Sequence, residues 1–474
     1  MEFLKELEFA ERKMEKVGRK TIFKTEIGRP YQVFERGGVH VIQTLQGFWH
    51  RALLWAARNG LHYELVDLRA PDLLRDPRFD LMHGFRFNQR EFVETGLLRG
   101  YSGMMGAPTR YGKSTCLLNI LRAYPTAPAV VLAPGKTLLK QTLAEMRDQI
   151  PDREVKLIGG GSTVKYQSDD ITIVSMDSVH KIDKAAVRLV LVDEPHAIAS
   201  AGRIGHVPGF HLARKIALGA TLKGRYDGRD AMLEGIFGPI LSEVTYREAV
   251  DMGAVCQIKV PMIQIPIRPE PGNRERIYKS QYLENDRLMK IVADMSNRLI
   301  PKEDQTLMFI KQEKQGRRLL QHVGEHVPLV MDKVLTSKER DAITEAVEKN
   351  HVARVVCSDI FVQGVTFHDI RYLINTSGGG PGTTALQRPG RLAEIRPDKR
   401  FGVMADFQHV LAPKRPGQPP RPDNMGGVKA LVREARQRAE VYAEVGYHVD
   451  EVHPDQLENW MKDHNTHESG SLPA

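Results

Sequence analysis

Short apolar segments alternate with helical stretches through the first half of the chain. The apolar segments span residues 129–134, 171–176, 189–194 and 215–220, and each is typical of a strand that is buried on both faces. Strands of this kind belong to parallel sheets that helices cover on both sides. The pattern therefore predicts a doubly wound α/β lobe over residues 85–252.

The same alternation returns over residues 253–411, with a long helix expected near 273–299. Its strands are expected at residues 307–310, 353–358, 372–377 and 401–407. A second lobe with the same α/β architecture is therefore predicted. The fold class is α/β, with two lobes that each hold a parallel sheet.

A proline-rich and basic segment at 412–422 follows the second lobe and predicts a semi-rigid linker. After it comes a helix expected at about 425–446. Its basic side chains contact either solvent or nucleic acid; they are Lys429, Arg433, Arg436 and Arg438. Residues 412–474 are thus expected to form a linker and a basic C-terminal helix outside the lobe.

The first 84 residues have a different pattern and predict a small α+β module. Strands are expected at 21–27, 31–36, 39–43 and 63–69, with a helix from about 48 to 59. The aromatic residues Phe48, Trp49 and Trp55 belong either to the core of this module or to a surface that stacks on bases.

Composition narrows the classes to which the protein can belong. At 474 residues the chain has room for about three domains of ~150 residues each. No apolar run approaches the ~20 residues of a membrane span, and the mixed-charge N-terminus does not resemble a secretory signal. We therefore expect no membrane partner and a cytoplasmic protein, in bacteria or in a phage-infected host.

The cysteines and the net charge add two further constraints. Cys116, Cys256 and Cys357 lie far apart, which supports neither a disulfide framework nor a cysteine-based zinc site. His322 and His326 have the spacing of a helical metal site, but exposed helical histidines explain them equally simply. The formal charge of +9 favours a polyanionic partner.

A phosphate-binding loop is predicted at residues 107–114, where A-x4-G-K-S lies between an apolar strand and a helix. Backbone amides at the start of the helix would hold phosphate oxygens. Lys113 would pair with the β and γ phosphates, and the Ser114 hydroxyl would bind Mg²⁺. The predicted nucleotide-binding residues are Ala107, Pro108, Thr109, Arg110, Tyr111, Gly112, Lys113, Ser114 and Thr115.

Two carboxylates follow a later apolar strand, in the sequence DEPH at 193–196. The carboxyl edge of an open parallel sheet is where ligands bind. Asp193 is therefore predicted to hold Mg²⁺ together with Ser114, and Glu194 to position the water that attacks ATP.

Four motifs in this order resemble superfamily 2 helicases of the DExH type: AxxxxGKS, DExH, GAT at 219–221 and QRPGR at 387–391. The resemblance covers residues 85 to 411 and implies two RecA-like lobes. The stretch at 234–255 resembles the link between lobes in UvsW-type phage helicases, with the RecG and XPB types more distant.

The resemblance also implies roles for residues outside the phosphate loop. Gln89 would read adenine, Gly364 and Arg388 would bind the nucleotide, and Gln387 and Arg391 would be catalytic. The residues implied in gripping the nucleic-acid backbone are Pro134, Lys136, Ser175, Ser178, Thr221 and Ser358.

The last motif departs from the family pattern at one position. The family usually has Q-R-x-G-R-x-x-R, and here Glu394 stands where the final arginine is expected. A carboxylate cannot stabilise the negative charge that develops on a transferred phosphate. Arg391, or Arg396 two residues beyond Glu394, must then supply the arginine finger.

The function predicted from these motifs is that of an ATP-dependent DNA helicase or translocase that uses ATP and Mg²⁺. Its expected partners are single-stranded, forked or four-way-junction DNA, and single-strand-binding or recombination proteins, with the chain acting as a monomer on DNA. Fork regression and branch migration in recombination and repair are the expected tasks. The alternatives are an RNA-remodelling helicase and the translocating subunit of a restriction system.

Overall fold

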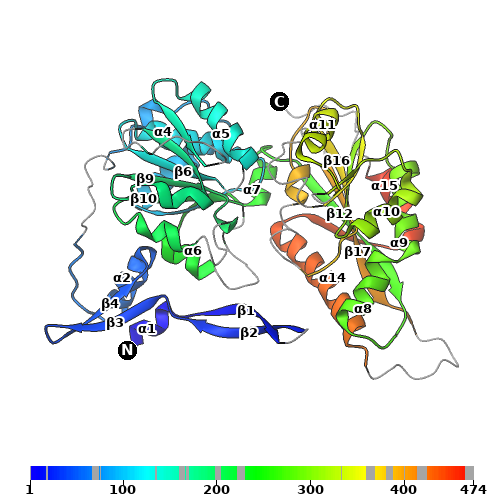
Figure 1. The fold of residues 1–474 in the computed structure, drawn as a ribbon, viewed down its shortest axis with the longest axis horizontal. Helices are drawn as coiled ribbons and strands as arrows, with labels where there is room; N and C mark the ends of the chain where they lie inside the picture. The colour runs from blue at the N-terminus through cyan, green and yellow to red at the C-terminus, as the bar shows by residue number, and fades with distance from the viewer. Residues whose placement is uncertain are drawn as a thin grey trace. The chain divides into compact units, whose positions relative to one another are not determined.

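The computed structural model describes most of the chain, in two compact units, Met1–Thr245 and Tyr246–Ala474 (Figure 1). Within the described ranges that follow, side chains are described except at 11–24, 136–141 and 337. The described residues are 2–17, 20–66, 74, 76–133, 136–159, 166, 170–197, 204–220, 222, 230–331, 334–358, 369–380, 388–399, 401–413 and 424–464.

The first unit contains a parallel sheet of seven strands in the order β11-β5-β10-β9-β6-β8-β7. The strands are β5 (Gly103–Gly106), β6 (Ala129–Ala133), β7 (Val155–Ile158), β8 (Ile171–Ser175), β9 (Leu189–Asp193), β10 (Arg214–Gly219) and β11 (Ile240–Glu243). The central strands are buried along almost their whole length, as in a sheet that is covered on both faces. The predicted α/β class is confirmed for this lobe.

Helices and short 3-10 turns connect these strands. The helices are α3 (Gln89–Arg99), α4 (Lys113–Ala123), α5 (Lys136–Gln149) and α6 (Asp230–Phe237). The 3-10 turns are η2 (Phe79–Leu81), η3 (Met176–Lys181), η4 (Pro195–Ala197) and η5 (Ile204–Gly209).

The N-terminal module consists of two antiparallel hairpins and two helices, drawn in blue in Figure 1. Its elements are α1 (Glu2–Leu7), β1 (Phe9–Val17), β2 (Lys20–Gly28), β3 (Tyr31–Arg36), β4 (Val39–Thr44), η1 (Gln46–Phe48) and α2 (Trp49–Arg58). The strand predicted at 63–69 is wrong over 63–66, where the backbone has no regular structure, and the rest lies outside the described residues. Tyr63, Leu65 and Val66 are exposed, so burial does not favour a strand there.

The module packs on the first lobe. Phe48 is completely buried, and a side chain at Gly235 of α6 would meet its ring at 2.7 Å. Glu234 of the same helix accepts hydrogen bonds from His50 (2.9 Å) and Arg51 (2.8 Å). Burial alone would raise the pKa of Glu234, but these two bonds lower it to about 2. Phe48 is therefore a core residue, shared between the module and the lobe.

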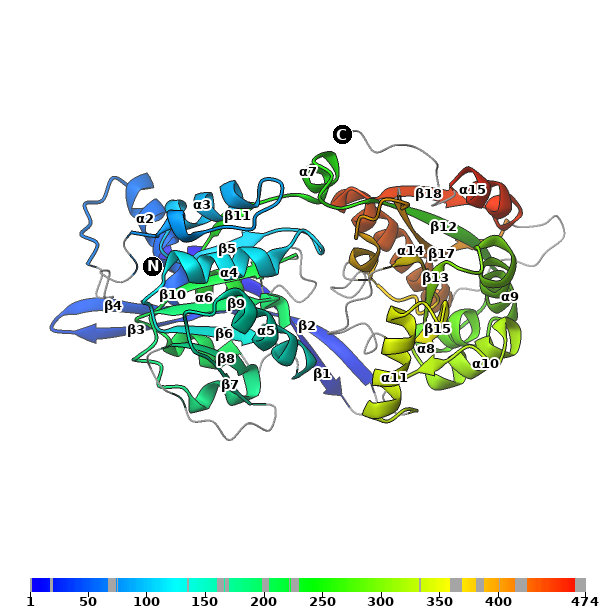
Figure 2. The ribbon, with the colours of Figure 1, turned by 90° about the horizontal axis from the view of Figure 1, so that it is seen from above.

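The second unit contains another parallel sheet of seven strands, in the order β14-β15-β13-β16-β17-β12-β18 (Figure 2). Its strands are β12 (Gln257–Ile267), β13 (Gln305–Phe309), β14 (Leu329–Val330), β15 (Arg354–Cys357), β16 (Ile370–Asn375), β17 (Phe401–Leu411) and β18 (His448–Val452). Its other elements include α7 (Tyr246–Asp251), α10 (Glu313–Val323), α11 (Ser337–Glu348) and η8 (Pro389–Leu392). The predicted second α/β lobe is confirmed.

The long helix expected at 273–299 is interrupted. It forms α8 (Arg274–Tyr278), the π-helical turn η6 (Lys279–Leu283), α9 (Asp286–Asp294) and the π-helical turn η7 (Met295–Leu299). The break occurs at Asn285, whose side chain accepts a hydrogen bond from the backbone N–H of Leu288 and so caps α9.

The C-terminal segment belongs to the second lobe, in contrast to the boundary expected at residue 411. The predicted linker lies outside the described residues from 414 onward. Helix α14 (Gly426–Val445) contacts β17, and β18 pairs with β12 in the same sheet. The turn η9 (Pro454–Gln456) and helix α15 (Leu457–Asp463) follow. The side chain of Arg438 on α14 is only 1% exposed and forms an ion pair with Asp406 inside the lobe. It therefore contacts neither solvent nor nucleic acid. Among the described helices, none is long and apolar enough to cross a bilayer.

Candidate nucleotide site and helicase motifs

The phosphate loop lies where the sequence predicts it, between β5 and α4. Gly112 precedes α4 with φ +98°, a conformation that glycine adopts readily. Four non-glycine residues in the described chain have positive φ. Arg110 and Glu194 lie in the phosphate loop and the acidic motif, and Phe87 lies two residues before Gln89. Such conformations are costly and concentrate at functional sites.

Strand β10 joins the phosphate loop to the acidic motif. It lies between β5 and β9 in the sheet, and all three strands are parallel. The backbone N–H of Ala107 donates to the carbonyl of Gly219 (3.1 Å), and that of Glu194 donates to the carbonyl of Leu218 (2.9 Å). The loop, the acidic pair and the start of the GAT motif therefore meet at one sheet edge.

Lys113 contacts both motifs at this edge. Its Nζ donates to the carbonyl oxygens of Ala107 and Pro108 at 3.3 Å and lies 3.7 Å from Glu194 Oε1. The side chain is only 10% exposed, so its charge acts with little screening by water. Glu194 also lies 3.1 Å from His196 Nδ1. Lys113, which is predicted to neutralise phosphate charge, and Glu194, which is predicted to position the attacking water, are thus neighbours.

The acidic pair has the properties of a cation-binding group. Burial, and then the neighbouring charge of Glu194, raise the pKa of Asp193 to about 6. A divalent cation would relieve this repulsion, and carboxylate and hydroxyl oxygens are ligands that Mg²⁺ accepts. Ser114, on the first turn of α4, is exposed and offers such a hydroxyl. Asp193 and Ser114 therefore fit the Mg²⁺ that accompanies ATP.

Gln89 holds the phosphate loop against α3. The side chain is buried, accepts from the backbone N–H of Arg86 (2.9 Å) and donates to the carbonyl of Tyr111 (2.6 Å). A side chain at Gly112 would lie 2.5 Å from the Gln89 amide. The Tyr111 hydroxyl donates to Asn88 (2.5 Å). These contacts give Gln89 a positioning role that the sequence did not indicate, while its reading of adenine stays a prediction.

The predicted nucleic-acid contacts of the first lobe follow β6 and β8, which are neighbours in the sheet. Ser175 ends β8 and donates to the Ser178 hydroxyl at 3.0 Å. Lys136 begins α5, but its side chain lies outside the described residues, as do Pro134 and Thr221. The structure thus brings Ser175 and Ser178 together at the carboxyl edge.

The motifs of the second lobe are described in part. Arg388 is almost buried and donates to Asn375 Oδ1 and to the Ser377 hydroxyl, both at 2.7 Å. Arg391 lies on η8 and is partly exposed. Ser358 follows β15 and is also partly exposed. Gly364 and Gln387 lie outside the described residues.

Glu394 faces Arg396, because its Oε1 lies 3.9 Å from that guanidinium. This pairing occupies Arg396 with a carboxylate of its own lobe. The assignment of the arginine finger to Arg391 stays a prediction.

A buried polar network behind Arg388 was missed from the sequence. Asp406 on β17 accepts from Asn375 (3.0 Å), Arg438 (3.0 Å) and Tyr442 (2.9 Å), and both Asp406 and Arg438 are essentially without exposure. Asn375 in turn accepts from Arg388. An aspartate inside the apolar segment FGVMADF was the available signal, since a buried carboxylate requires a partner.

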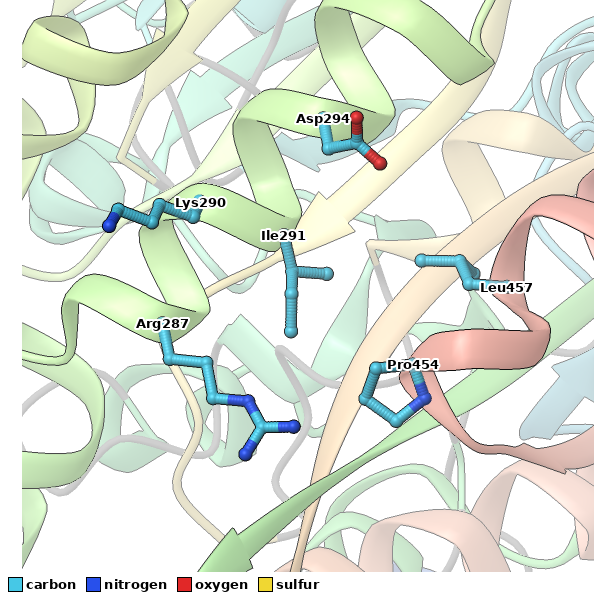
Figure 3. Close-up of a pocket in the computed structure, with 6 residues that line it drawn as sticks. All are labelled: Arg287, Lys290, Ile291, Asp294, Pro454 and Leu457. Atoms are coloured by element: carbon cyan, nitrogen blue, oxygen red, sulfur yellow. The ribbon is translucent and has the colours of Figure 1, made fainter.

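A surface pocket of about 400 Å³ in the second lobe is a separate feature (Figure 3). Asp294, Ile291 and other side chains of α9 form one wall, and Pro454 and Leu457 form the other. Its lining includes none of the predicted site residues.

Two family models match the chain over the regions that carry these motifs. The model described as "Type III restriction enzyme, res subunit" matches residues 86–224. The model described as "Helicase conserved C-terminal domain" matches residues 286–396. Each match falls on one of the two seven-stranded sheets. The chain is a superfamily 2 helicase of the DExH type.

One curated relative of this superfamily 2 helicase is a viral protein named "Probable helicase A859L", from African swine fever virus (strain Badajoz 1971 Vero-adapted). The two are 26% identical over 264 residues, which cover 49% of this chain and 30% of the viral protein. The match thus spans less than a third of that relative's length.

Solved structures share the two-lobed fold at low sequence identity. The structure described as a fragment of "a putative HsdR subunit of a type I restriction enzyme from Vibrio vulnificus YJ016" has a TM-score of 0.58 at 14% identity, covering 94% of this chain and 92% of that chain. S. cerevisiae Dbp5 bound to RNA and ADP BeF3 has a TM-score of 0.52 at 14% identity, covering 84% and 97%. T4 UvsW matches with a TM-score of only 0.35, so the narrower UvsW-type assignment stays a prediction.

Proposed function

We propose that this helicase couples ATP hydrolysis to movement along DNA and acts on branched DNA. The observation that carries the ATPase part is the joining of Lys113, Asp193 and Glu194 at one sheet edge through β10. This arrangement brings a phosphate-pairing ammonium and a water-activating carboxylate to the same nucleotide.

Each residue has a defined part in hydrolysis. Lys113 pairs with the β and γ phosphates and neutralises charge as the terminal bond breaks. Glu194 orients a water molecule and takes its proton as the oxygen bonds to the γ phosphorus and ADP leaves. Asp193 and Ser114 would hold Mg²⁺, which would supply further neutralisation of phosphate charge. Arg391 is proposed as the finger that stabilises the transferring phosphoryl group.

Contacts with the backbone of the track explain movement without sequence preference. Ser175 and Ser178 lie together at the carboxyl edge of the first sheet, where hydroxyl groups can donate to phosphate oxygens. Lys136 follows the neighbouring strand, and the chain carries a formal charge of +9. Binding to such a track is driven by released counterions and should weaken steeply with salt.

Branched DNA is the most specific part of the proposal and rests on the N-terminal module. Its hairpin β3-β4 exposes Phe34 (43%) and Val39 (63%), while η1 and α2 fasten it to the first lobe. An exposed apolar hairpin on a motor lobe can part base pairs by stacking or wedging.

A restriction translocase is the second candidate function. It is favoured by the family model for residues 86–224 and by the likeness to the HsdR fragment. RNA remodelling is a third candidate, and only the likeness to the fold of Dbp5 favours it. Contacts with the phosphate backbone do not by themselves distinguish ribose from deoxyribose.

The decisive experiment compares ATP turnover with single-stranded DNA, duplex DNA, forked DNA, four-way junctions and RNA at one salt concentration. The proposal expects stimulation by DNA and unwinding or migration of junctions. Phe34→Ser should reduce junction processing while leaving turnover on single-stranded DNA unchanged. Stimulation by RNA alone would favour RNA remodelling. Translocation along unbranched duplex, with no effect on junctions, would favour the restriction-type motor.

A further inference from the structure

Three side chains of metal-binding type meet at the edge of the second sheet. His448, Asp450 and His464 each present a ligand atom, and these atoms all lie within 4.8 Å of one another. His448 and Asp450 are two residues apart on β18 and so point to the same side of the strand. His464 directly follows α15, which brings it back to the strand.

The distances suit a common ion. His448 Nε2 and Asp450 Oδ2 are 3.3 Å apart. Two ligands held at about 2.0–2.1 Å from a tetrahedral zinc ion lie at nearly this separation from each other. None of the three side chains belongs to the nucleotide site.

Trp460 orients two of the three ligands. Its indole Nε1–H donates to Asp450 Oδ2 at 2.9 Å, and its ring stacks on the His464 imidazole with centroids 4.2 Å apart. Its backbone carbonyl lies 2.8 Å from His464 Nδ1. A carbonyl can only accept, so the proton must be on Nδ1, and Nε2 keeps its lone pair.

Hydrogen bonds of this kind, to the ligand groups themselves, are normal for metal-binding histidines and carboxylates. A ligating histidine almost always donates its other N–H to a carbonyl or carboxylate, and a ligating carboxylate is itself hydrogen-bonded. Trp460 supplies both contacts. An ordinary surface ion pair between His448 and Asp450 would not require them.

We propose that His448, Asp450 and His464 bind a divalent first-row transition ion, with Zn²⁺ as the best match. Two imidazoles and one carboxylate suit zinc, whereas Mg²⁺ and Ca²⁺ select oxygen ligands. Three protein ligands leave a fourth position for water. The ion fastens the edge strand β18 to the end of α15, which closes that edge of the second sheet.

A matched control lies a few residues away. His453 and Asp455 have the same His-x-Asp spacing, and His453 Nδ1 lies 3.3 Å from Asp455 Oδ2, the same separation as in the first pair. Their side chains are 46% and 86% exposed. This pair is not part of the three-ligand cluster, so His453→Ala tests histidine content without touching the site.

The experiment uses the full chain without an affinity tag, freed of metal by chelation and dialysis. Zn²⁺ is titrated in competition with a chromophoric chelator. One ion should bind per chain, and His448→Ala, His464→Ala and Asp450→Asn should each lower the affinity at least ~10-fold. His453→Ala should leave the affinity unchanged.

A second measurement follows the site through Trp460. In a Trp49→Phe/Trp55→Phe background, Trp460 is the remaining tryptophan of the chain. Co²⁺ or Ni²⁺ bound beside the stacked ring should quench its fluorescence at one equivalent, and Zn²⁺ in excess should reverse the quenching. Circular dichroism of the His448→Ala variant tests whether it is folded.

Three results would overturn the proposal. They are no saturable Zn²⁺ binding, equal affinity in the parent and His448→Ala, or an equal loss in His453→Ala. The site is independent of ATP hydrolysis, so a failure here leaves the proposed motor function untouched.

Discussion

Replacing Arg438 with methionine tests the buried network behind the last helicase motif. Arg438 is 1% exposed and Asp406 is 0% exposed, and the guanidinium donates to both carboxylate oxygens at 3.0 Å. Methionine is similar in length to arginine and fills irregular space, so a cavity should contribute little to the change in the free energy of unfolding. The main effect is a buried carboxylate that has lost its cation and keeps only neutral donors.

Breaking a buried ion pair from one side costs about 3–5 kcal/mol. The free energy of unfolding of the second unit should fall by that amount in Arg438→Met. Arg436→Met is the matched control, because Arg436 lies on the same helix but is 77% exposed in its pair with Glu440. An exposed pair of this kind contributes ~0.3–0.5 kcal/mol.

Urea unfolding followed by Trp460 fluorescence, in the Trp49→Phe/Trp55→Phe background, reports on the second unit. The double variant Asp406→Asn/Arg438→Met removes both charges and should be less destabilised than Arg438→Met alone. A loss below about 1 kcal/mol in Arg438→Met, or a double variant that is less stable than both single variants, would refute the reasoning.

Three further predictions concern the nucleotide site. Lys113→Ala should abolish ATP turnover, whereas Glu194→Gln should retain ATP binding and lose hydrolysis; steady-state turnover and equilibrium binding of a fluorescent ATP analogue measure both, and normal turnover in Glu194→Gln would remove its role as base. The pKa of Asp193 is raised to about 6, so its carboxyl favours the folded state at low pH and this contribution is lost as pH rises through about 6. Mg²⁺-dependent ATP affinity should therefore fall as the pH drops below about 6, and Asp193→Asn should lack this dependence; a pH-independent affinity in the parent would contradict it. Arg391→Ala should lower turnover by ~10³-fold or more, and an inactive Arg396→Ala beside an active Arg391→Ala would show that the finger is Arg396.

The strands and motifs could be predicted because their signals are local. A run such as LVLVDE is apolar at every position until it reaches the sheet edge, so it indicates both a buried strand and the place of its two carboxylates. The phosphate loop requires a glycine with positive φ before a helix, and Gly112 meets that requirement. The predicted strand at 63–69 was wrong over 63–66 because apolar letters do not show whether a pairing strand is present.

The sequence by itself determined the two α/β lobes, the phosphate loop and the acidic pair, since each depends on residues close together in the chain. Only the tertiary structure decided the contacts between residues that are far apart in sequence. It buried Arg438 against Asp406, turned Gln89 toward the phosphate loop, and brought His464 beside His448 and Asp450. The sequence does not show whether a charged side chain or a histidine faces solvent or another side chain. The chemistry of that residue depends on this environment, which the fold determines.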